Sequence, residues 1–265
     1  MKDQLNTSES PESWPAFSYA DEVPGFWEEA KANHYKKGNL KTDCDAKSVK
    51  LYDQMMEWLD GKELPDGQVI HLTRAGKYLL KKEDIRLSGD NVFTRFTGRV
   101  PDLMDELEEI KGSEWKAYQQ RIIRNGWRIG GEILFPRHRN SLNGMRGFSR
   151  QIMDRFDLTL ECIQNFYEDK NSPLSWVLEM DREWFELFVN FQGFIDFFLL
   201  NDWVDENYQV IDQLGTGNLL PETVSELEAW HIRMEELVEA RTLRIVADVC
   251  KRKTGKTVND GERRN

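Results

Sequence analysis

The chain has 265 residues, of which 39% are hydrophobic, and a formal net charge of −11 at pH 7. Nine Trp and fourteen Phe residues exclude a globally disordered protein, because this composition can bury a sizeable core. The acidic balance argues against non-specific coating of DNA, since affinity for phosphate backbones comes from positive surface charge.

The sequence also bears on membrane contact and cellular compartment. The most apolar stretch, residues 185–200, is interrupted by polar residues and is shorter than the roughly 20 apolar residues that span a bilayer. No basic segment followed by an apolar one opens the chain, so we expect no signal peptide. Cys44, Cys162 and Cys250 are widely spaced, which favours free thiols in a reducing compartment. We therefore expect a cytoplasmic protein without membrane contact, bound metal or cofactor.

The N-terminal segment, residues 1–24, holds prolines among acidic and hydroxyl residues. It predicts a flexible arm that Trp14 and Phe17 pin to the body. Apolar residues at helical spacing then predict helices over 26–37 and 48–59.

A β-rich region is predicted next. Pro65-Asp66-Gly67 is a turn signal, since Pro presets φ, Asp caps locally and Gly adopts positive φ. Short β-like runs, separated by Gly76 and by turn residues at 88–91, predict a small antiparallel meander. The predicted strands are residues 68–73, 77–82, 85–87 and 92–96. Amphipathic helices are expected after them, over 101–110 and 113–125.

The centre of the chain is predicted to contain a strand, a polar loop and a helix. Residues 126–136 predict a strand that enters a polar, glycine-containing loop over 137–147. Helical spacing then predicts one helix over 148–167.

The last part of the chain is rich in aromatic residues. Ser172 and Pro173 form an N-cap and N1 pair, which predicts the start of a helical stretch that reaches about residue 204 with a break near Gly193. Its aromatic side chains recur at helical spacing, which indicates core packing rather than a base-stacking platform. A final helix is predicted over 221–253, and Gly255 is expected to end it.

These elements predict an α+β fold, in which a mostly α-helical C-terminal part packs on a small N-terminal mixed α/antiparallel-β part. We expect one globular domain over 25–253 and a charged tail over 254–265.

Arginine is concentrated in one window. Eight arginines and no lysine lie between Arg121 and Arg155, and two acids leave the window at +6 (eight minus two). Arginine is favoured where a planar, always-charged group must meet carboxylate or phosphate. The window is therefore the best candidate for a functional site, although no motif in the chain identifies a reaction.

A charged stripe crosses the predicted 148–167 helix. At 100° per residue, Arg150, Asp154, Asp157 and Glu161 fall on one face. Apolar residues flank this face on both sides, which indicates that the carboxylates meet partners inside the fold or in a cleft.

We expect the 137–147 loop and this helix to bind an anionic, phosphate-bearing ligand, such as a nucleotide or a nucleic-acid end. Backbone N–H groups and the dipole at a helix N-terminus favour such anions. The predicted ligand contacts are Arg137, Arg139 and Arg146 as phosphate clamps, Arg150, and Asn143 as the orienting group. Asp154, Asp157 and Glu161 are the supporting carboxylates, and the last two orient the arginines or act as an acid/base pair.

The alternative is a structural ion-pair network that fastens the loop to the helix. The arginines outnumber the carboxylates, which keeps the ligand hypothesis open. Nearby guanidinium groups disfavour a metal at these carboxylates. His138 is expected to be an exposed loop histidine, with a general base as the alternative. His231 is expected to be a packing or surface residue, and His71 to be structural.

The centre of the chain contains Gly130-Gly131, Leu134-Phe135-Pro136, Arg146-Gly147-Phe148 and the run Asp154-Arg155-Phe156-Asp157-Leu158-Thr159-Leu160-Glu161-Cys162-Ile163. This pattern resembles the signature of an uncharacterised bacterial and phage protein family. The resemblance runs from about Asp43 to Ile245. It implies the extent of the domain and the importance of the central segment, and it implies no activity.

A second hypothesis of a different class remains open. The acidic surface itself could be the binding face of a protein-interaction module, such as a phage-type regulator or inhibitor that docks on a basic partner. The arginine and carboxylate set would then be purely structural.

Overall fold

The computed structural model describes residues 10–21, 49–73, 78–80, 85–96, 98–138 and 140–262. The helix predicted over 26–37 and the predicted contact Arg139 lie outside these residues. The first elements are η1 (Pro11–Ala16), η2 (Tyr19–Asp21), α2 (Val49–Leu59), β1 (Leu72–Thr73), β2 (Tyr78–Leu80), β3 (Ile85–Asn91), α3 (Pro101–Lys111), η3 (Gly112–Glu114) and α4 (Trp115–Gly126). The helices predicted over 48–59, 101–110 and 113–125 are thus confirmed to within about two residues.

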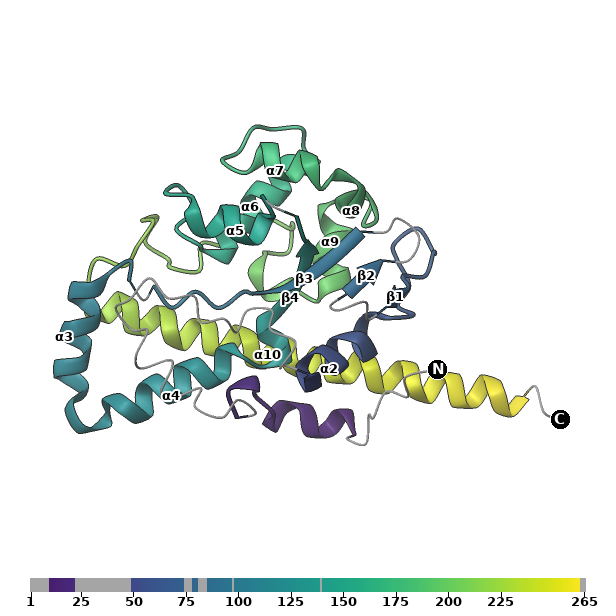
Figure 1. Cartoon of the computed structure of the whole chain (residues 1–265), viewed down its shortest axis with the longest axis horizontal. Helices are drawn as coiled ribbons and strands as arrows, with labels where there is room; N and C mark the ends of the chain where they lie inside the picture. The colour runs from purple at the N-terminus through teal and green to yellow at the C-terminus, as the bar shows by residue number, and fades with distance from the viewer. Residues whose placement is uncertain are drawn as a thin grey trace.

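The second half of the chain is mainly helical. Its elements are η4 (Ile129–Gly131), β4 (Glu132–Pro136), α5 (Leu142–Phe148), α6 (Phe156–Tyr167), α7 (Ser175–Met180), α8 (Arg182–Glu186), α9 (Phe191–Phe198), η5 (Asn201–Trp203) and α10 (Val224–Glu262). The sheet lies in the middle of the fold, with α5–α9 on one side and α10 along the other (Figure 1). The predicted α+β class, with a helical C-terminal part, is confirmed.

Within the described residues the sheet has the strand order β1-β2-β3-β4, and every pair is antiparallel. Leu87 of β3 lies opposite Pro136 of β4, and Asn91 opposite Glu132. The turn predicted at 88–91 is therefore wrong, as is the strand over 92–96. Polar side chains in β3 bind outside their own strand, because Asn91 Nδ2 donates to the Gly126 carbonyl oxygen at 2.5 Å. Tertiary pairing overrides their turn propensity.

The single helix predicted over 148–167 is also wrong at its start. The polar loop contains α5, and α6 begins only at Phe156. Met153 and Asp154 adopt φ of 53° and 65°, and left-handed residues end a right-handed helix. Arg150 and Asp154 therefore precede α6 and share no helical stripe with Asp157.

The aromatic segment folds as three short helices, α7 to α9. Its predicted start at Ser172 is wrong, because Leu174 precedes α7. The helical stretch is broken near Gly193, as predicted, although Gly193 itself lies within α9. The break falls just before α9, where Val189 has a φ of 68°. Asn190 then caps α9, since its side chain accepts a hydrogen bond from Gly193 N at 2.8 Å.

Helix α10 connects the parts of the fold. It contacts α2, α3, α4, η1 and η4, and its buried apolar residues include Leu227, Trp230, Met234, Leu237, Val238, Ile245 and Val249. The predicted end at Gly255 is wrong, since the helix continues to Glu262; a glycine inside a helix costs only about 1 kcal/mol and need not end it. None of the described helices combines the length and apolar character that crossing a membrane requires.

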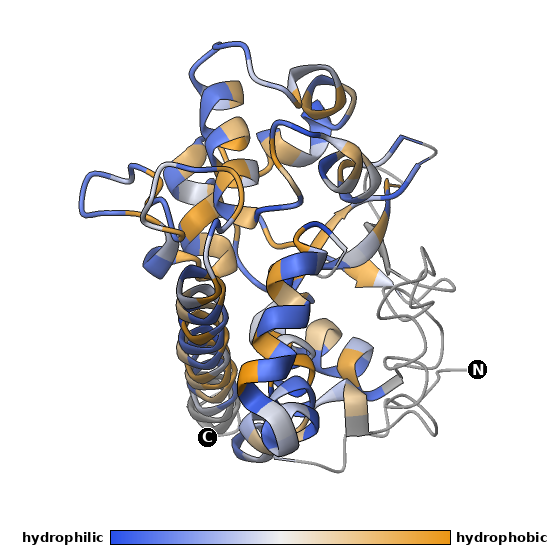
Figure 2. Ribbon diagram, turned by 90° about the vertical axis from the view of Figure 1, so that its left-hand side faces the viewer, coloured by the Kyte–Doolittle hydropathy of each residue, from blue (hydrophilic) through white to orange (hydrophobic). Residues whose placement is uncertain are grey.

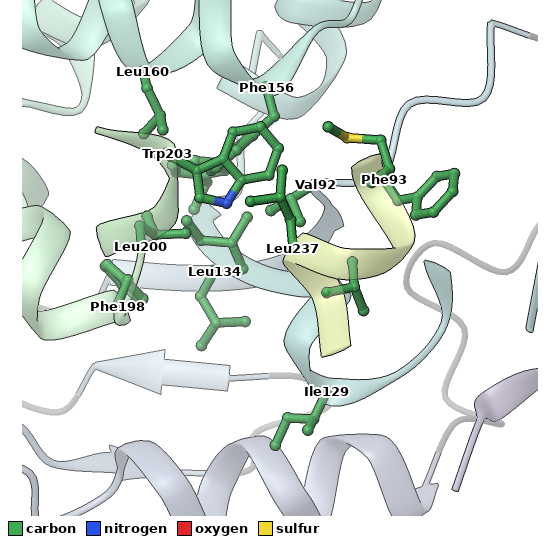
Figure 3. Close-up of a cluster of buried hydrophobic side chains, with 14 of the residues drawn as sticks. Val92, Phe93, Ile129, Leu134, Phe156, Leu160, Phe198, Leu200, Trp203 and Leu237 are labelled. Carbon is green, nitrogen blue, oxygen red and sulfur yellow. The ribbon is translucent and has the colours of Figure 1, made fainter. Parts of the chain in front are cut away.

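The core lies where the sheet meets the helices on both sides. Leu134 of β4, Phe156 of α6, Trp203 of η5 and Leu237 of α10 point toward one another (Figure 3), and the Phe156 and Trp203 rings meet edge to face at 4.9 Å. Figure 2 shows the apolar residues of the helices turned toward this interior. The aromatic residues predicted as core are mostly buried, with Trp176 as an exposed exception.

The N-terminal arm is described over residues 10–21. Trp14 and Phe17 are buried there, as predicted for the two anchors, and η1 lies against α10. This part of the arm is therefore packed rather than free.

Candidate functional site

Arg146 is one of two buried and extensively hydrogen-bonded residues of the arginine window. Its side chain is 1% exposed, although it carries a full charge. Its hydrogen-bond acceptors are Asp90 Oδ2 at 2.6 Å, Thr159 Oγ1 at 3.2 Å, and the carbonyl oxygens of Asn91 at 3.1 Å and Asp154 at 2.8 Å. The guanidinium thus fastens β3, the 153–154 turn and α6 to one another.

Arg155 forms a second buried centre. Its guanidinium binds both carboxylate oxygens of Asp157, at 3.1 and 2.5 Å, and Asp212 Oδ1 at 2.5 Å. It also donates to the Asn218 carbonyl oxygen at 2.5 Å and lies 5.4 Å from the centre of the Trp230 ring. A buried charge costs free energy unless it is paired and hydrogen-bonded, and both conditions are met here.

The other predicted contacts are dispersed. Arg137 and Arg150 are exposed, and neither pairs with a described carboxylate; Glu161 is exposed as well. Asn143 Nδ2 donates to Ser88 Oγ at 3.3 Å and to the Gly89 carbonyl oxygen at 3.1 Å, which ties α5 to β3.

Arg146 and Arg155 therefore have the surroundings expected of a structural network. Both guanidinium groups are committed to acceptors within the chain, so neither presents a row of vacant donors to a ligand. The ligand contacts proposed for Arg137, Arg139 and Arg150 stay predictions.

The two buried arginines hold the turn between them. Arg146 and Thr94 both donate to the Asp154 carbonyl oxygen, Thr94 Oγ1 at 2.6 Å. Arg155 follows Asp154 directly, and its guanidinium pairs with Asp157 of α6. The Asp154 carboxylate is held more loosely, by an ion pair of 3.6 Å with Arg146 Nε, and 46% of its side chain is exposed.

A pocket opens at this turn. It has a volume of about 180 Å³ and lies between the end of β3, the 92–99 segment, the end of α4 and the turn itself. We call it the Arg99 pocket. Its lining residues are Asp90, Asn91, Phe93, Thr94, Arg95, Phe96, Arg99, Ile123, Gly126, Trp127, Met153 and Asp154. Phe93, on one side of the pocket, adjoins the core cluster of Figure 3.

The pocket wall carries both signs of charge. Arg95 and Arg99 supply the positive groups, and Arg99 Nη2 donates to the Gly147 carbonyl oxygen. Of the two acids, Asp90 is paired with Arg146. Loss of water on the inner side of Asp154 raises the pKa of its carboxyl above the ordinary value, with Asp90 adding to the rise and Arg146, Arg99 and Arg95 opposing it. The exposed outer side of the group limits this shift.

Backbone strain is concentrated around the same pocket. Seven non-glycine residues in the described part of the chain have positive φ, and three of them, Phe96, Met153 and Asp154, line the pocket. Such conformations cost about 1 kcal/mol or more each and persist only where the surrounding structure holds them. The network of Arg146 and Arg155 supplies that constraint for the turn.

Sequence reasoning missed the pocket residues Arg95 and Arg99. Both lie upstream of the arginine window, in and just after the segment predicted as a strand over 92–96. No periodicity or motif marks them, because the pocket forms only when β3 and the 153–154 turn meet.

His138 differs from the exposed loop residue that was expected. It is half-buried, and its Nε2 lies 2.9 Å from Asp181 Oδ1. The Asn140 N–H donates to Nδ1 at 3.3 Å, which favours the tautomer that donates from Nε2 to Asp181. Burial raises the pKa of Asp181 to about 6, and the histidine opposes this rise. The pair fastens the segment after β4 to the start of α8.

His231 is a packing residue, in agreement with expectation. It is 2% exposed, stacks on Phe93, and forms hydrogen bonds with Tyr118 Oη at 2.8 Å and the Arg95 carbonyl oxygen at 3.2 Å. Burial lowers the pKa of His231 to about 4. The folded chain therefore holds the neutral imidazole at neutral pH.

This burial predicts a pH-dependent contribution to stability. The unfolded state takes up a proton at His231 as pH falls through about 6.5, whereas the folded state does so only near 4, so stability is lost between these values. The loss is on the order of 3 kcal/mol at the acidic end. The measurement is urea unfolding of the wild type and His231→Gln from neutral pH to pH 4. The free energy of unfolding of the wild type should decrease toward that of the variant as pH falls. A difference between the two proteins that stays constant with pH would contradict the assignment of His231 as a buried, neutral histidine.

Residues 29–245 of the chain match the model of a family of unknown function (DUF6994). The chain belongs to this family. The resemblance expected from the central segment is thereby confirmed at the level of the family, and the match begins upstream of Asp43. No curated protein and no solved structure matches the chain.

The DUF6994 match covers the whole Arg99 pocket, since its lining residues lie between Asp90 and Asp154. It also covers both buried arginines of the network. The family carries no established activity, so function must be inferred from the site itself.

Proposed function

We propose that this DUF6994 chain binds a small phosphate-bearing anion in the Arg99 pocket. The observation that carries the proposal is the meeting of Arg95, Arg99 and the strained Asp154 turn in one pocket wall. Guanidinium groups donate well-directed hydrogen bonds to phosphate oxygens. The buried network then serves the site indirectly, because it holds the turn that forms one wall.

The size of the pocket limits the ligand. About 180 Å³ is the volume of roughly six liquid water molecules and is below the roughly 300–1,000 Å³ of pockets that enclose drug-sized ligands. The pocket suits a phosphate ion or the phosphoryl end of a larger molecule. A nucleotide or a nucleic-acid end would place its phosphate inside and its base outside.

The proposal predicts that Arg99→Ala weakens phosphate binding by at least about tenfold, since a hydrogen bond to a charged group contributes roughly 1.5–3 kcal/mol. Isothermal titration calorimetry with inorganic phosphate and with a nucleoside monophosphate, at low ionic strength, measures the effect. Low salt is needed because exposed charges are screened.

Arg182→Ala is the matched control. It also removes one exposed arginine, from a residue that does not line the pocket. The control should bind phosphate as the wild type does. Absence of phosphate binding to the wild type, or equal weakening in both variants, would overturn the proposed function.

A second candidate is an interaction module for a basic protein, such as a regulator or inhibitor of phage type. The observation that favours it is the internal pairing of Arg146 and Arg155, which was expected if the arginine and carboxylate set is structural. The excess acidic charge of the chain then faces a partner. The amount of a basic protein retained in a pull-down should fall steeply as the salt concentration rises. Retention that does not change with salt would contradict this second candidate function.

A further inference from the structure

The Asp154 carboxylate is the unusual group of the proposed anion pocket. In the described part of the chain no N–H or O–H group donates a hydrogen bond to it, and the nearest guanidinium nitrogen, Arg146 Nε, is 3.6 Å away. That guanidinium already binds Asp90 at 2.6 Å. An ionised Asp154 is thus an acceptor with unused hydrogen-bonding capacity, on a residue that lines the pocket together with Arg95 and Arg99.

A pocket with two donors and one acceptor does not suit every anion equally. Hydrogen phosphate has oxygens that accept from guanidinium groups and one O–H group that can donate to a carboxylate. Sulfate has nearly the same size and charge, but near neutral pH it carries no proton. A sulfate oxygen beside an ionised Asp154 would place two acceptors against each other.

We infer that Asp154 makes the Arg99 pocket selective for protonated oxyanions, so that inorganic phosphate binds and sulfate is rejected. The inference rests on the proposed function and names the ligand chemistry of the same site. Arg95 and Arg99 bind the anion through its unprotonated oxygens, and Asp154 accepts the hydrogen bond from its O–H group. Selectivity thus comes from a repulsive contact with the wrong anion.

The neighbouring charges support this division of roles. Four charged groups act on Asp154: Asp90, Arg146, Arg99 and Arg95. Asp90 is neutralised by Arg146, so it adds little attraction or repulsion at the ligand. The position of Asp154 is fixed through its backbone carbonyl by Arg146 and Thr94, whereas its carboxylate has only the longer, 3.6 Å ion pair with Arg146.

The test compares phosphate and sulfate binding near neutral pH, by calorimetry, in the wild type and in Asp154→Asn. The wild type should bind phosphate at least about tenfold more tightly than sulfate. In Asp154→Asn the amide can donate to a sulfate oxygen, so sulfate affinity should rise and the ratio should approach one. Asn tolerates positive φ well, so the turn should be retained, and circular dichroism checks this.

Glu183→Gln is the control for net charge, because it neutralises an exposed carboxylate on α8 outside the pocket lining. It should leave the ratio unchanged. If the wild type binds neither phosphate nor sulfate, both the proposed function and this inference are wrong. If it binds both equally, or if Asp154→Asn keeps the wild-type ratio, the inference fails while the anion pocket stands.

A second measurement needs no variant. Lowering the pH protonates Asp154, whose pKa is raised by burial, and converts the acceptor into a donor. Sulfate affinity of the wild type should then increase as pH falls, while sulfate itself stays unprotonated. Sulfate binding that does not change with pH would overturn the role of Asp154, even if Asp154→Asn failed to fold.

Discussion

Arg146→Ala is expected to destabilise the fold by about 3–5 kcal/mol, as is typical when one partner of a buried ion pair is removed. The substitution leaves Asp90 without its cation and the carbonyl oxygens of Asn91 and Asp154 without this donor. It also opens a cavity beside the Phe156 ring, which lies 5.5 Å from the guanidinium carbon. Urea unfolding followed by circular dichroism measures the loss.

The control for this prediction is Arg150→Ala, since Arg150 is exposed and an exposed arginine contributes at most about 1 kcal/mol. We also expect Arg146→Lys to restore little, because a lysine cannot reproduce the planar fork of donors. If Arg146→Ala kept the wild-type stability and lost only phosphate binding, Arg146 would be a ligand contact rather than a structural residue.

Gly130→Ala is expected to have the second large effect, and to prevent folding or lower stability by several kcal/mol. A Cβ atom at this position would lie 2.1 Å from the Val238 carbonyl oxygen and 2.6 Å from Thr242 N, both of which belong to the backbone of α10. Relief of this clash requires η4 to move away from α10. That movement would break the hydrogen bonds from Gly130 N to Thr242 Oγ1 and from Arg241 Nη1 to the Gly130 carbonyl oxygen.

Gly144→Ala provides the comparison, because it adds the same methyl group within the short helix α5. Its Cβ would meet only Ser141 Oγ, at 3.9 Å, which is ordinary contact. Alanine is favoured over glycine in a helix, so stability should be unchanged or rise by up to about 1 kcal/mol. The melting temperatures of the two variants give the measurement. A Gly130→Ala protein that melts with the wild type would show that η4 and α10 are not in close contact.

The arginine window, residues 121–155, shows what the pattern of charges along the sequence can predict. This pattern identified a segment in which arginines pair with carboxylates, and it was compatible with a structural ion-pair network. The sequence did not show that Arg146 pairs with Asp90, because that partner lies 56 residues away on β3. It also did not single out Arg95 and Arg99, whose surroundings arise from three separated segments.

The errors in element boundaries have a common physical origin. Residues 88–91 have turn propensity, yet they form a strand because β4 pairs with them. Residues 149–155 have helical spacing, yet Met153 and Asp154 adopt left-handed conformations, because Arg146 and Thr94 hold the Asp154 carbonyl oxygen. Local preferences of about 1 kcal/mol per residue yield to several tertiary hydrogen bonds.

By itself, the sequence determined the fold class, the first three antiparallel strands and the long terminal helix, because each follows from hydrophobic periodicity along a continuous segment. It also determined that the chain belongs to a family whose match covers most of its length. Only the tertiary structure decided which arginines are buried, where the 153–154 turn lies and which residues line a pocket. Those features depend on contacts between residues far apart in the chain, and no local pattern records them.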